Sequence, residues 1–354
     1  MKIDINQDQY FEVEKLALGV FAPLDRFMHE DDFYSCVEKM RLSNGHVFTI
    51  PIFFDISETM EQEFKGVDKI ALQFNGEHVA NLFPDSFFRP KLEDICQKVF
   101  LTTESSHPGV HHYHSAGKVF VGGKVELIKR ASFSFSASEY TPAQTKAYFK
   151  QMGWKKIVGF QTRNIPHRAH EYLQKAALEA VDGILIQPIV GKKKAGDFTA
   201  EAVVASYQAL IDHYYPANRV KFATLSTVMR YAGPREAVFH ALIRKNYGCT
   251  HFIIGRDHAG VGKYYDKYAG HQLAQLFENE LGIEIFKFNG PYLCQKCDGI
   301  VTSKSCPHEV TSPNDCIEIS GTLIRKLLLH EQDIDLRIIR PEVIASLKNL
   351  NIFI

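Results

Sequence analysis

The strongest constraint on the fold is a regular alternation of short apolar segments with helical segments, which begins near residue 142. The apolar segments cover residues 156–160, 183–188, 220–225 and 251–255, and the helical segments cover 142–153, 166–181, 200–213 and 234–247. Such alternation predicts an α/β domain with a parallel sheet covered by helices on both faces. Ligands of these sheets bind beyond the carboxyl ends of the strands. Polar motifs at those ends are therefore the first candidates for a functional site.

The first 130 or so residues have a different pattern, rich in β-branched and aromatic residues broken by turn signals. We expect helices at 8–18 and 30–41, and strands at 47–54, 69–74 and 77–82. Asn75-Gly76 predicts a tight hairpin turn between the last two strands. Residues 119–128 predict a further strand pair with a turn at its two glycines. The chain therefore divides into a mostly β N-terminal domain and an α/β domain.

The composition limits the classes of partner. The formal net charge of the 354 residues is zero, so no global charge favours nucleic acid, whereas a small anionic substrate needs only a few local cations. The N-terminus has no signal-peptide pattern, and no segment has the ~20 apolar residues that span a membrane. We therefore expect a cytoplasmic protein without a membrane partner. Seven scattered or clustered cysteines argue against a disulfide framework.

The first polar motif runs from Gln161 to Glu171, directly after the apolar segment 156–160. Asn164 can cap the following helix, and His167 and His170 are three residues apart, on one face of its first turn. Free backbone N–H groups and the helix dipole also favour anions there. The alternative is a capped helix with surface histidines. Gln, Arg and Asn before the pair, at a strand end, favour a polyphosphate site instead.

Two further motifs are weaker by themselves. Residues 255–262 follow the fourth apolar segment and combine three glycines with an Arg, an Asp and a His, which suits close backbone approach to a ligand. A glycine-rich connecting loop is the alternative. The segment is not a Walker A loop, because Asp257 and Tyr264 occupy its first glycine and its Ser/Thr positions. Residues 319–325 predict a helix start with capping hydroxyls and a cation, Arg325, which fits a routine cap equally well.

The cysteine cluster predicts a metal site. Cys294-x-x-Cys297, followed by Cys306 and His308, has the spacing of a zinc knuckle. We expect a closed structural Zn²⁺ site with three cysteine ligands. His308 is the candidate for the fourth ligand, although it lies only two residues after Cys306. The alternative is buried free thiols in a reducing compartment.

In this order and spacing, the three polar motifs resemble those of the ATP sulfurylases, and the similarity runs from about residue 14 to about residue 347. Supporting stretches lie at 21–24, 40–42, 107–110, 229–236 and 306–308. The resemblance implies a PUA-like domain over residues 1–135, a Rossmann-like nucleotidyltransferase domain over 136–290, and a C-terminal region over 291–354 that carries the zinc knuckle. It also implies reversible transfer of AMP from ATP to sulfate, by in-line attack on the α-phosphorus, giving adenylylsulfate and pyrophosphate.

The resemblance further implies roles for individual residues. Sulfate is expected at Gln161, Arg163 and the backbone of Ala259. The nucleotide is expected at Gln161, Thr162, Arg163, Asn164, Gly255, Arg256, Asp257 and His258. The expected catalytic residues are Thr162, Arg163, Asn164, His167, His170 and Arg256. Mg²⁺ is expected to arrive with ATP, and a homodimer is the family's usual assembly.

The sequence departs from the family pattern in three places, and two other functions compete. We expect the family's usual N-terminal leader to be largely missing and no adenylylsulfate-kinase domain to be present. The loop Lys192–Asp197, which includes Lys194, replaces a more familiar Thr-Lys-Pro-Gly-Asp loop, so the role of Lys194 stays open. The competing functions are another His-x-x-His adenylyltransferase with a phosphate-bearing acceptor, and a non-catalytic sensor of sulfate or nucleotide. Release of pyrophosphate from ATP and sulfate separates all three. Both the assimilatory and the ATP-forming direction stay open.

Overall fold

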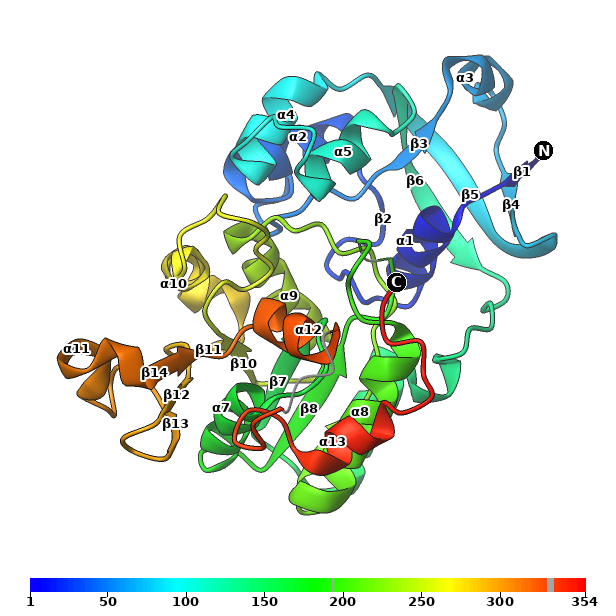
Figure 1. The fold of residues 1–354 in the computed structure, drawn as a ribbon. Helices are drawn as coiled ribbons and strands as arrows, with labels where there is room; N and C mark the ends of the chain where they lie inside the picture. The colour runs from blue at the N-terminus through cyan, green and yellow to red at the C-terminus, as the bar shows by residue number, and fades with distance from the viewer. Residues whose placement is uncertain (193, 330–333) are drawn as a thin grey trace.

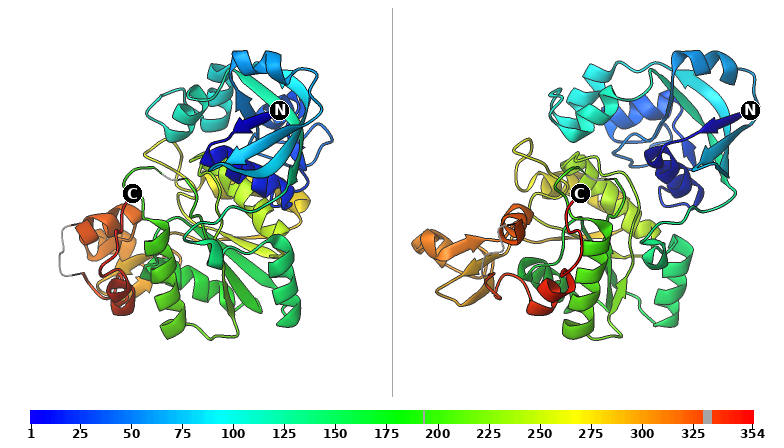
Figure 2. Two further views of the ribbon diagram at one scale, coloured as in Figure 1. Left: turned by 90° about the vertical axis from the view of Figure 1, so that its right-hand side faces the viewer. Right: turned by 45° about the vertical axis from the view of Figure 1, so that its right-hand side comes forward.

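The computed structural model describes residues 1–192, 194–329 and 334–354, and it contains three sheets (Figure 1). The N-terminal sheet is flanked by its own helices, the parallel sheet lies below it in the view of Figure 1, and a small third sheet projects to the side. Two further views show the C-terminus lying between the N-terminal and parallel-sheet parts (Figure 2). The three sheets follow one another along the chain.

The N-terminal sheet has six strands in the order β1-β4-β5-β6-β2, with β3 also paired to β6. Its hairpin turn has Asn75 at φ 51° and Gly76 at φ 77°, the positive values that a tight turn of this type requires, so the predicted hairpin is confirmed. The elements are β1 Lys2–Asp4, α1 Gln7–Ala17, β2 Arg26–Phe27, α2 Glu30–Lys39, β3 Phe54–Ile56, α3 Glu58–Phe64, β4 Ile70–Phe74, β5 Glu77–Phe88, α4 Leu92–Phe100, α5 Pro108–His114 and β6 Val119–Leu127.

The strand predicted over residues 47–54 is wrong. Val47 makes only an isolated bridge with Arg41, and the strand β3 begins at Phe54. Pro51 lacks a backbone N–H, which disfavours a ladder at this point. The side chains from residue 48 to 52 are all buried, so the segment packs on two sides rather than presenting one face to solvent. Its apolar character reflects that burial.

The strand pair predicted over residues 119–128 is also wrong, because the segment is one continuous strand, β6. Gly122 and Gly123 lie inside it, opposite an irregularity in the pairing between Pro84 and Ser86 of β5. A Cβ atom on Gly123 would lie 2.2 Å from the carbonyl oxygen of Phe83. These glycines therefore permit close approach of two strands, and they do not form a turn.

The second sheet confirms the predicted alternation of strands and helices. It is parallel throughout, in the order β11-β10-β7-β8-β9. The third predicted strand is shorter than expected, and Leu225 makes an isolated bridge with Ile189. The elements are α6 Pro142–Gln151, β7 Ile157–Thr162, α7 Arg168–Leu178, β8 Gly183–Pro188, α8 Ala200–Tyr214, β9 Val220–Phe222, α9 Pro234–Asn246, β10 His251–Ile254, α10 Ala269–Leu281 and β11 Glu284–Lys287; the 3₁₀ turn η1 Ser136–Ser138 precedes them.

The strand order reverses direction between β7 and β10. The chain runs outward from β7 through β8 to β9, and then returns to place β10 and β11 on the other side of β7. Loops that follow two such adjacent strands diverge and leave a crevice at the carboxyl edge of the sheet. The first two polar motifs follow β7 and β10, so the fold brings them to the two walls of this crevice.

The described C-terminal part contains a small antiparallel sheet, the short helix α11, and two helices, α12 and α13, that return to the parallel-sheet domain. Tyr214 of α8 donates a hydrogen bond of 2.6 Å to Glu342 of α13, and Phe353 bridges to Phe198 beyond. The elements are β12 Tyr292–Cys294, β13 Gly299–Val301, α11 His308–Thr311, the 3₁₀ turn η2 Pro313–Asp315, β14 Cys316–Glu318, α12 Gly321–Leu329 and α13 Pro341–Ser346. None of the described helices is long and apolar enough to cross a membrane.

A buried interface joins the N-terminal sheet domain to the parallel-sheet domain. Arg230 donates to both carboxylate oxygens of Glu12 in α1, at 2.7 and 2.8 Å. Lys15 donates to Ser226 at 2.8 Å and lies 3.0 Å from Glu139. One hydrophobic cluster continues across this interface from α1 to α9 and β10. The N-terminal domain is therefore packed firmly against the domain that carries the crevice.

Candidate active site

A cleft with a volume of about 340 Å³ lies where the crevice between β7 and β10 was expected. Residues from all three polar motifs line it. The lining includes every predicted substrate and catalytic residue: Gln161, Thr162, Arg163, Asn164, His167, His170, Gly255, Arg256, Asp257, His258 and Ala259. The structure thus brings together residues that lie almost 100 positions apart.

The two histidines of the first motif form a stacked pair. Their ring centroids are 3.7 Å apart, and Nδ1 of His167 accepts a hydrogen bond of 3.3 Å from the backbone N–H of His170. His167 is therefore the N-cap of α7, and the prediction that Asn164 caps this helix is wrong. Pro166 lies before the cap, so the helix starts one turn later than Asn164 would require. The side chain of Asn164 accepts from Arg325 instead, at 3.0 Å.

Burial keeps both histidines neutral near pH 7. It lowers the pKa of His170 to about 3. Burial, His170 and the positive charge of Arg256 together lower the pKa of His167 well below its ordinary value. Because Nδ1 of His167 accepts the backbone hydrogen bond, the proton of the neutral ring is on Nε2. That Nε2–H is a neutral donor in the cleft.

Arg163 crosses the cleft from the first motif to the second. Its Nη2 donates to the carbonyl oxygen of Gly260 at 3.1 Å, and the guanidinium lies 5.0 Å from the ring centroid of Tyr231. Its Nε is 3.7 Å from a carboxylate oxygen of Asp197 and has no hydrogen-bond partner among the described residues. Nε is therefore buried beside Asp197, whereas Nη1 makes no hydrogen bond to the described residues and keeps its N–H groups for an anion.

The second motif forms a tight turn, with Asp257 at φ 52° and Ala259 at φ 55°. The carbonyl oxygen of Ala259 accepts from the backbone N–H of Gly233 at 3.2 Å, whereas no backbone bond donated by Ala259 is found in the described part of the chain. Arg256 lies 3.0 Å from Glu318 and 3.5 Å from Asp257. The positive charge of Arg256 therefore lies at the cleft and also close to Glu318 of the small C-terminal sheet.

The third motif contributes Arg325, which no site prediction included. Ser320 caps α12 through a bond of 3.2 Å from the backbone N–H of Leu323, as expected, and the cleft lining also includes Gly321, Thr322 and Arg325. A Cβ atom on Gly321 would lie 2.8 Å from the side chain of Asn164. The helix start is thus packed directly against the first motif. A basic residue at the end of the motif 319–325 was the sequence signal that could have placed Arg325 in the site.

Asp197 is a second residue that the site predictions missed. Its fully buried carboxylate accepts from Arg325 at 2.8 Å and from the hydroxyl of Tyr231 at 2.9 Å, close to Arg163. One carboxylate thus stands between two arginines that line the cleft. An Asp in a polar loop gives no local signal for this role. Of the loop Lys192–Lys194, Lys193 lies outside the described residues.

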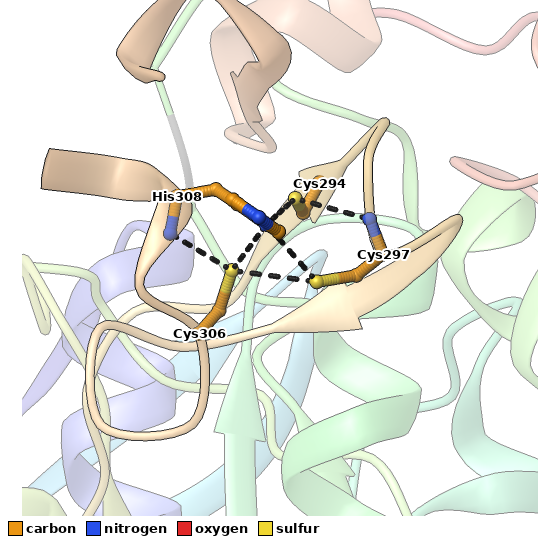
Figure 3. Close-up of side chains that lie close together, drawn as sticks. All are labelled: Cys294, Cys297, Cys306 and His308. Carbon is orange, nitrogen blue, oxygen red and sulfur yellow. Dashed lines mark hydrogen bonds between the residues drawn. The ribbon is translucent and has the colours of Figure 1, made fainter. Parts of the chain in front are cut away.

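The four predicted zinc ligands gather at one point beside the small C-terminal sheet (Figure 3), and none of them lines the cleft. The ligand atoms of Cys294, Cys297, Cys306 and His308 all lie within 4.8 Å of one another. Nδ1 of His308 is 3.3 Å from the sulfurs of Cys294 and Cys297, and 3.5 Å from that of Cys306. The sulfurs of Cys297 and Cys306 are 3.5 Å apart, much too far for a disulfide.

These separations fit a tetrahedral metal. Zinc bonds to sulfur and nitrogen imply edges of about 3.8 Å between two sulfurs and about 3.5 Å between a sulfur and a nitrogen. The backbone N–H groups of Cys297 and His308 also donate to the sulfurs of Cys294 and Cys306, each at 3.4 Å. Such bonds favour thiolates. The donor set therefore suits one Zn²⁺, with His308 oriented as the fourth ligand.

Comparison with known proteins gives two family matches that together cover most of the chain. A family model described as ATP-sulfurylase matches residues 136–350, and one described as a PUA-like domain matches residues 1–130. These matches confirm the predicted fold class, a PUA-like domain followed by an α/β domain with a parallel sheet.

Individual relatives agree with the family matches. The chain is 42% identical over 350 residues to a sulfate adenylyltransferase of Thermococcus onnurineus, covering 98% of this chain and 90% of the relative. It is 43% identical over 345 residues to a sulfate adenylyltransferase of Hyperthermus butylicus, covering 97% and 87%. Among solved structures, a hexameric APS kinase from Thiobacillus denitrificans matches with a TM-score of 0.74 at 20% identity, covering 98% of this chain and 62% of that chain. This last likeness concerns the fold alone.

Proposed function

The chain belongs to the ATP-sulfurylase family, and from this premise we propose how its cleft performs the reaction of a sulfate adenylyltransferase. The enzyme transfers the AMP part of ATP to sulfate and releases pyrophosphate. The observation that carries the proposal is the single cleft that all three polar motifs line. It offers three arginines, a stacked histidine pair and a helix N-terminus to substrates that are both anions.

Sulfate binds at Arg163, Gln161 and the backbone N–H of Ala259 in this proposal. Arg163 is restrained by Gly260 and Tyr231, yet its Nη1 makes no hydrogen bond within the described chain. A planar guanidinium with free N–H groups can hold two oxygens of a tetrahedral anion. The restraints reduce the entropy that Arg163 would lose on binding.

The triphosphate of ATP binds between the first and second motifs. One side of the nucleotide faces the part of the cleft lined by Gln161, Thr162, Arg163 and Asn164. The other side faces the part lined by Gly255, Arg256, Asp257 and His258. His167 offers Nε2–H at the start of α7, where the dipole of the helix also favours negative charge. Because the histidines are neutral near pH 7, they stabilise charge through hydrogen bonds, while Arg256 supplies the positive charge.

The chemical step is an in-line displacement. A sulfate oxygen forms a bond to the α-phosphorus, the bond from that phosphorus to the bridging β-oxygen breaks, and pyrophosphate leaves with the electron pair. No covalent nucleophile is required, and no cysteine lines the cleft. The residues act by positioning two anions that repel each other and by stabilising charge that grows on pyrophosphate. Thr162 and Asn164 support this geometry: the hydroxyl of Thr162 accepts from the backbone N–H of Asn164 at 3.1 Å.

Two metals belong to the proposal. The cleft lining has few carboxylates, Asp257 and Asp266, so Mg²⁺ would enter with ATP and would be held mainly by the phosphates and water. It neutralises phosphate charge. The second metal is a structural Zn²⁺ on Cys294, Cys297, Cys306 and His308, which closes the small C-terminal sheet.

The decisive experiment measures pyrophosphate release from purified protein. We expect release that requires both ATP and sulfate, and synthesis of ATP from adenylylsulfate and pyrophosphate in reverse. Release that instead requires a phosphate-bearing acceptor such as nicotinamide mononucleotide would support the competing adenylyltransferase. Nucleotide or sulfate binding without turnover would support the sensor. Three further points stay predictions: a homodimer, a cytoplasmic location, and domain limits at 135/136 and 290/291. Light scattering of the purified protein tests the homodimer.

A further inference from the structure

A buried row of three ionisable side chains leads from α9 into the cleft. Nδ1 of His240 is 3.1 Å from Nε2 of His258, and Nε2 of His240 is 3.5 Å from a carboxylate oxygen of Glu236. Glu236 and His240 are four residues apart on one face of α9, and they are 0% and 1% exposed. His258 lines the cleft. Nothing in the reaction described above uses Glu236 or His240.

The protons in this row can be assigned from the hydrogen bonds. The two oxygens of Glu236 accept from the backbone N–H groups of Arg230 and Ala232, both at 3.0 Å, so the carboxylate is ionised and only accepts. Burial alone would raise the pKa of Glu236, but His240 and the backbone of Arg230 lower it. The ring of His240 must therefore point a protonated Nε2 toward Glu236.

The assignment passes from one ring to the next. Burial lowers the pKa of His240 and lowers that of His258 well below its ordinary value, so both rings are neutral near pH 7. A neutral His240 with its proton on Nε2 has a lone pair on Nδ1, which accepts from Nε2–H of His258. The remaining nitrogen of His258, Nδ1, is then an acceptor. No hydrogen bond to it is present within residues 1–192, 194–329 and 334–354.

We propose that Glu236 and His240 are positioning residues that fix the tautomer of His258, so that its Nδ1 accepts a hydrogen bond from the nucleoside part of ATP. Of the two substrates, sulfate and the Mg²⁺-bound triphosphate of ATP carry no proton to donate at neutral pH. The donors that ATP offers are the ribose hydroxyls and the 6-amino group of adenine. An acceptor on His258 therefore recognises one of these two groups. This inference rests on the proposed function and deepens it.

The first test reads the tautomer directly. In protein with ¹⁵N-labelled histidine, the His258 signals, identified by their loss in a His258→Gln variant, should show a protonated Nε2 and an unprotonated Nδ1. A protonated Nδ1 in the wild-type protein would overturn the proposal. The measurement requires no activity, so it separates failure of the inference from failure of the proposed function.

The second test compares two substitutions of the middle residue. His240→Asn keeps an acceptor near the position of Nδ1 and should retain the tautomer and the KM for ATP. His240→Leu leaves Nε2–H of His258 without an acceptor, so the proton moves to Nδ1, and the KM for ATP should rise about tenfold with the KM for sulfate unchanged. Equal KM values for ATP in folded His240→Leu and wild type would overturn the proposal. The control is His251→Asn, which removes another His–Glu pair, 3.2 Å from Glu284, outside the cleft lining.

A third test identifies the donor with the wild-type protein. The analogues are 2′-deoxy-ATP and 3′-deoxy-ATP, which each lack one ribose hydroxyl, and inosine triphosphate, which lacks the amino group. The analogue that lacks the true donor should bind the wild type more weakly than ATP does. His240→Leu should bind that analogue and ATP equally. The analogue with that behaviour names the group. If all three analogues weaken both proteins equally, His258 accepts from none of these groups and the proposal is wrong. Equilibrium binding gives the same comparison if no turnover is found.

Discussion

At the scale of single residues, the cleft depends on cations that are restrained before any substrate arrives. Arg163 and Arg325 both lie against the buried carboxylate of Asp197, and Tyr231 also donates to it. Burial lowers the pKa of Arg325, and Asp197 opposes this effect. One carboxylate cannot neutralise two guanidinium groups. The remaining positive charge is available to sulfate or phosphate.

Substitution of Arg163 tests this view. Arg163→Ala should lower kcat/KM for sulfate by between about tenfold and about a hundredfold, since a hydrogen bond to a charged group contributes about 1.5–3 kcal/mol. Arg163→Lys should recover part of the loss, because it restores the charge but not the planar fork. Steady-state kinetics of pyrophosphate release, with circular dichroism to show folding, provide the measurement. Near-normal kinetics in Arg163→Ala would contradict the sulfate role.

The neutral histidine pair predicts how stability depends on pH. The pKa of His170 is about 3 in the folded protein, below its ordinary value of 6.5, so the unfolded chain binds more protons below pH 6.5. The contribution of neutral His170 to the free energy of unfolding is therefore fully present above pH 6.5 and is lost as the pH falls toward 3. Between pH 7 and pH 5 one such histidine lowers the free energy of unfolding by about 2 kcal/mol.

Urea unfolding at several pH values measures this effect. His170→Gln should lose about 2 kcal/mol less than the wild type between pH 7 and pH 5. His213→Gln removes an exposed histidine from α8 and should follow the wild-type curve. Identical pH dependence in His170→Gln and wild type would show that His170 is not buried as a neutral ring.

At the scale of elements, the small C-terminal sheet has little core of its own. Its three strands are three residues each, and its buried apolar cluster consists of Tyr292, Cys294 and Cys306. So small an element cannot bury enough surface to fold independently. A metal that binds only the folded form adds its binding free energy to stability. The proposed Zn²⁺ would therefore supply stability that these short strands lack.

Metal analysis and a pair of cysteine variants test the zinc site. The wild type should contain about one zinc per chain. Cys297→Ser should lose zinc and lower Tm, with less effect on activity well below Tm because the cluster lies outside the cleft. Cys316→Ser is the matched control, since Cys316 pairs with Cys294 across the sheet but is not in the ligand set. If His308→Ala retains zinc and full stability, the fourth ligand is another group.

At the scale of the whole molecule, a buried interface brings the PUA-like domain into contact with a residue that lines the cleft. His107 of the PUA-like domain contacts the hydroxyl of Tyr265, which lines the cleft, at 3.1 Å. The pair of Arg230 and Glu12 lies in the same interface, at 8% exposure for each residue. A buried pair of this kind contributes little net stability, but removing one partner leaves an unpaired buried charge.

A double-mutant cycle on this pair measures the coupling between the domains. Glu12→Leu and Arg230→Leu should each lower the free energy of unfolding by about 3–5 kcal/mol, and the double variant should lose much less than their sum. Glu77→Gln, which removes an exposed ion pair with Lys129, should have only a small effect. Additive losses in the double variant would mean that the two side chains do not interact.

The sequence by itself determined the features that depend on local spacing. The alternation from residue 142 predicted the parallel sheet, because each strand and helix has its own apolar period. The spacing of Cys294, Cys297, Cys306 and His308 predicted a cluster that the fold brings within metal-binding distance. The resemblance of the three motifs to the ATP sulfurylases identified the family, which the comparisons confirm.

Only the tertiary structure decided which distant groups meet. Asn164 failed as a helix cap because the start of α12 packs against it and Arg325 binds its side chain. Asp197 and His240 are buried in contact with residues that line the cleft, and neither has a motif of its own. Local spacing encodes neighbours within a few residues, whereas contacts across a hundred positions depend on how sheet and helices pack. The polar groups that this packing buries must then find partners in three dimensions.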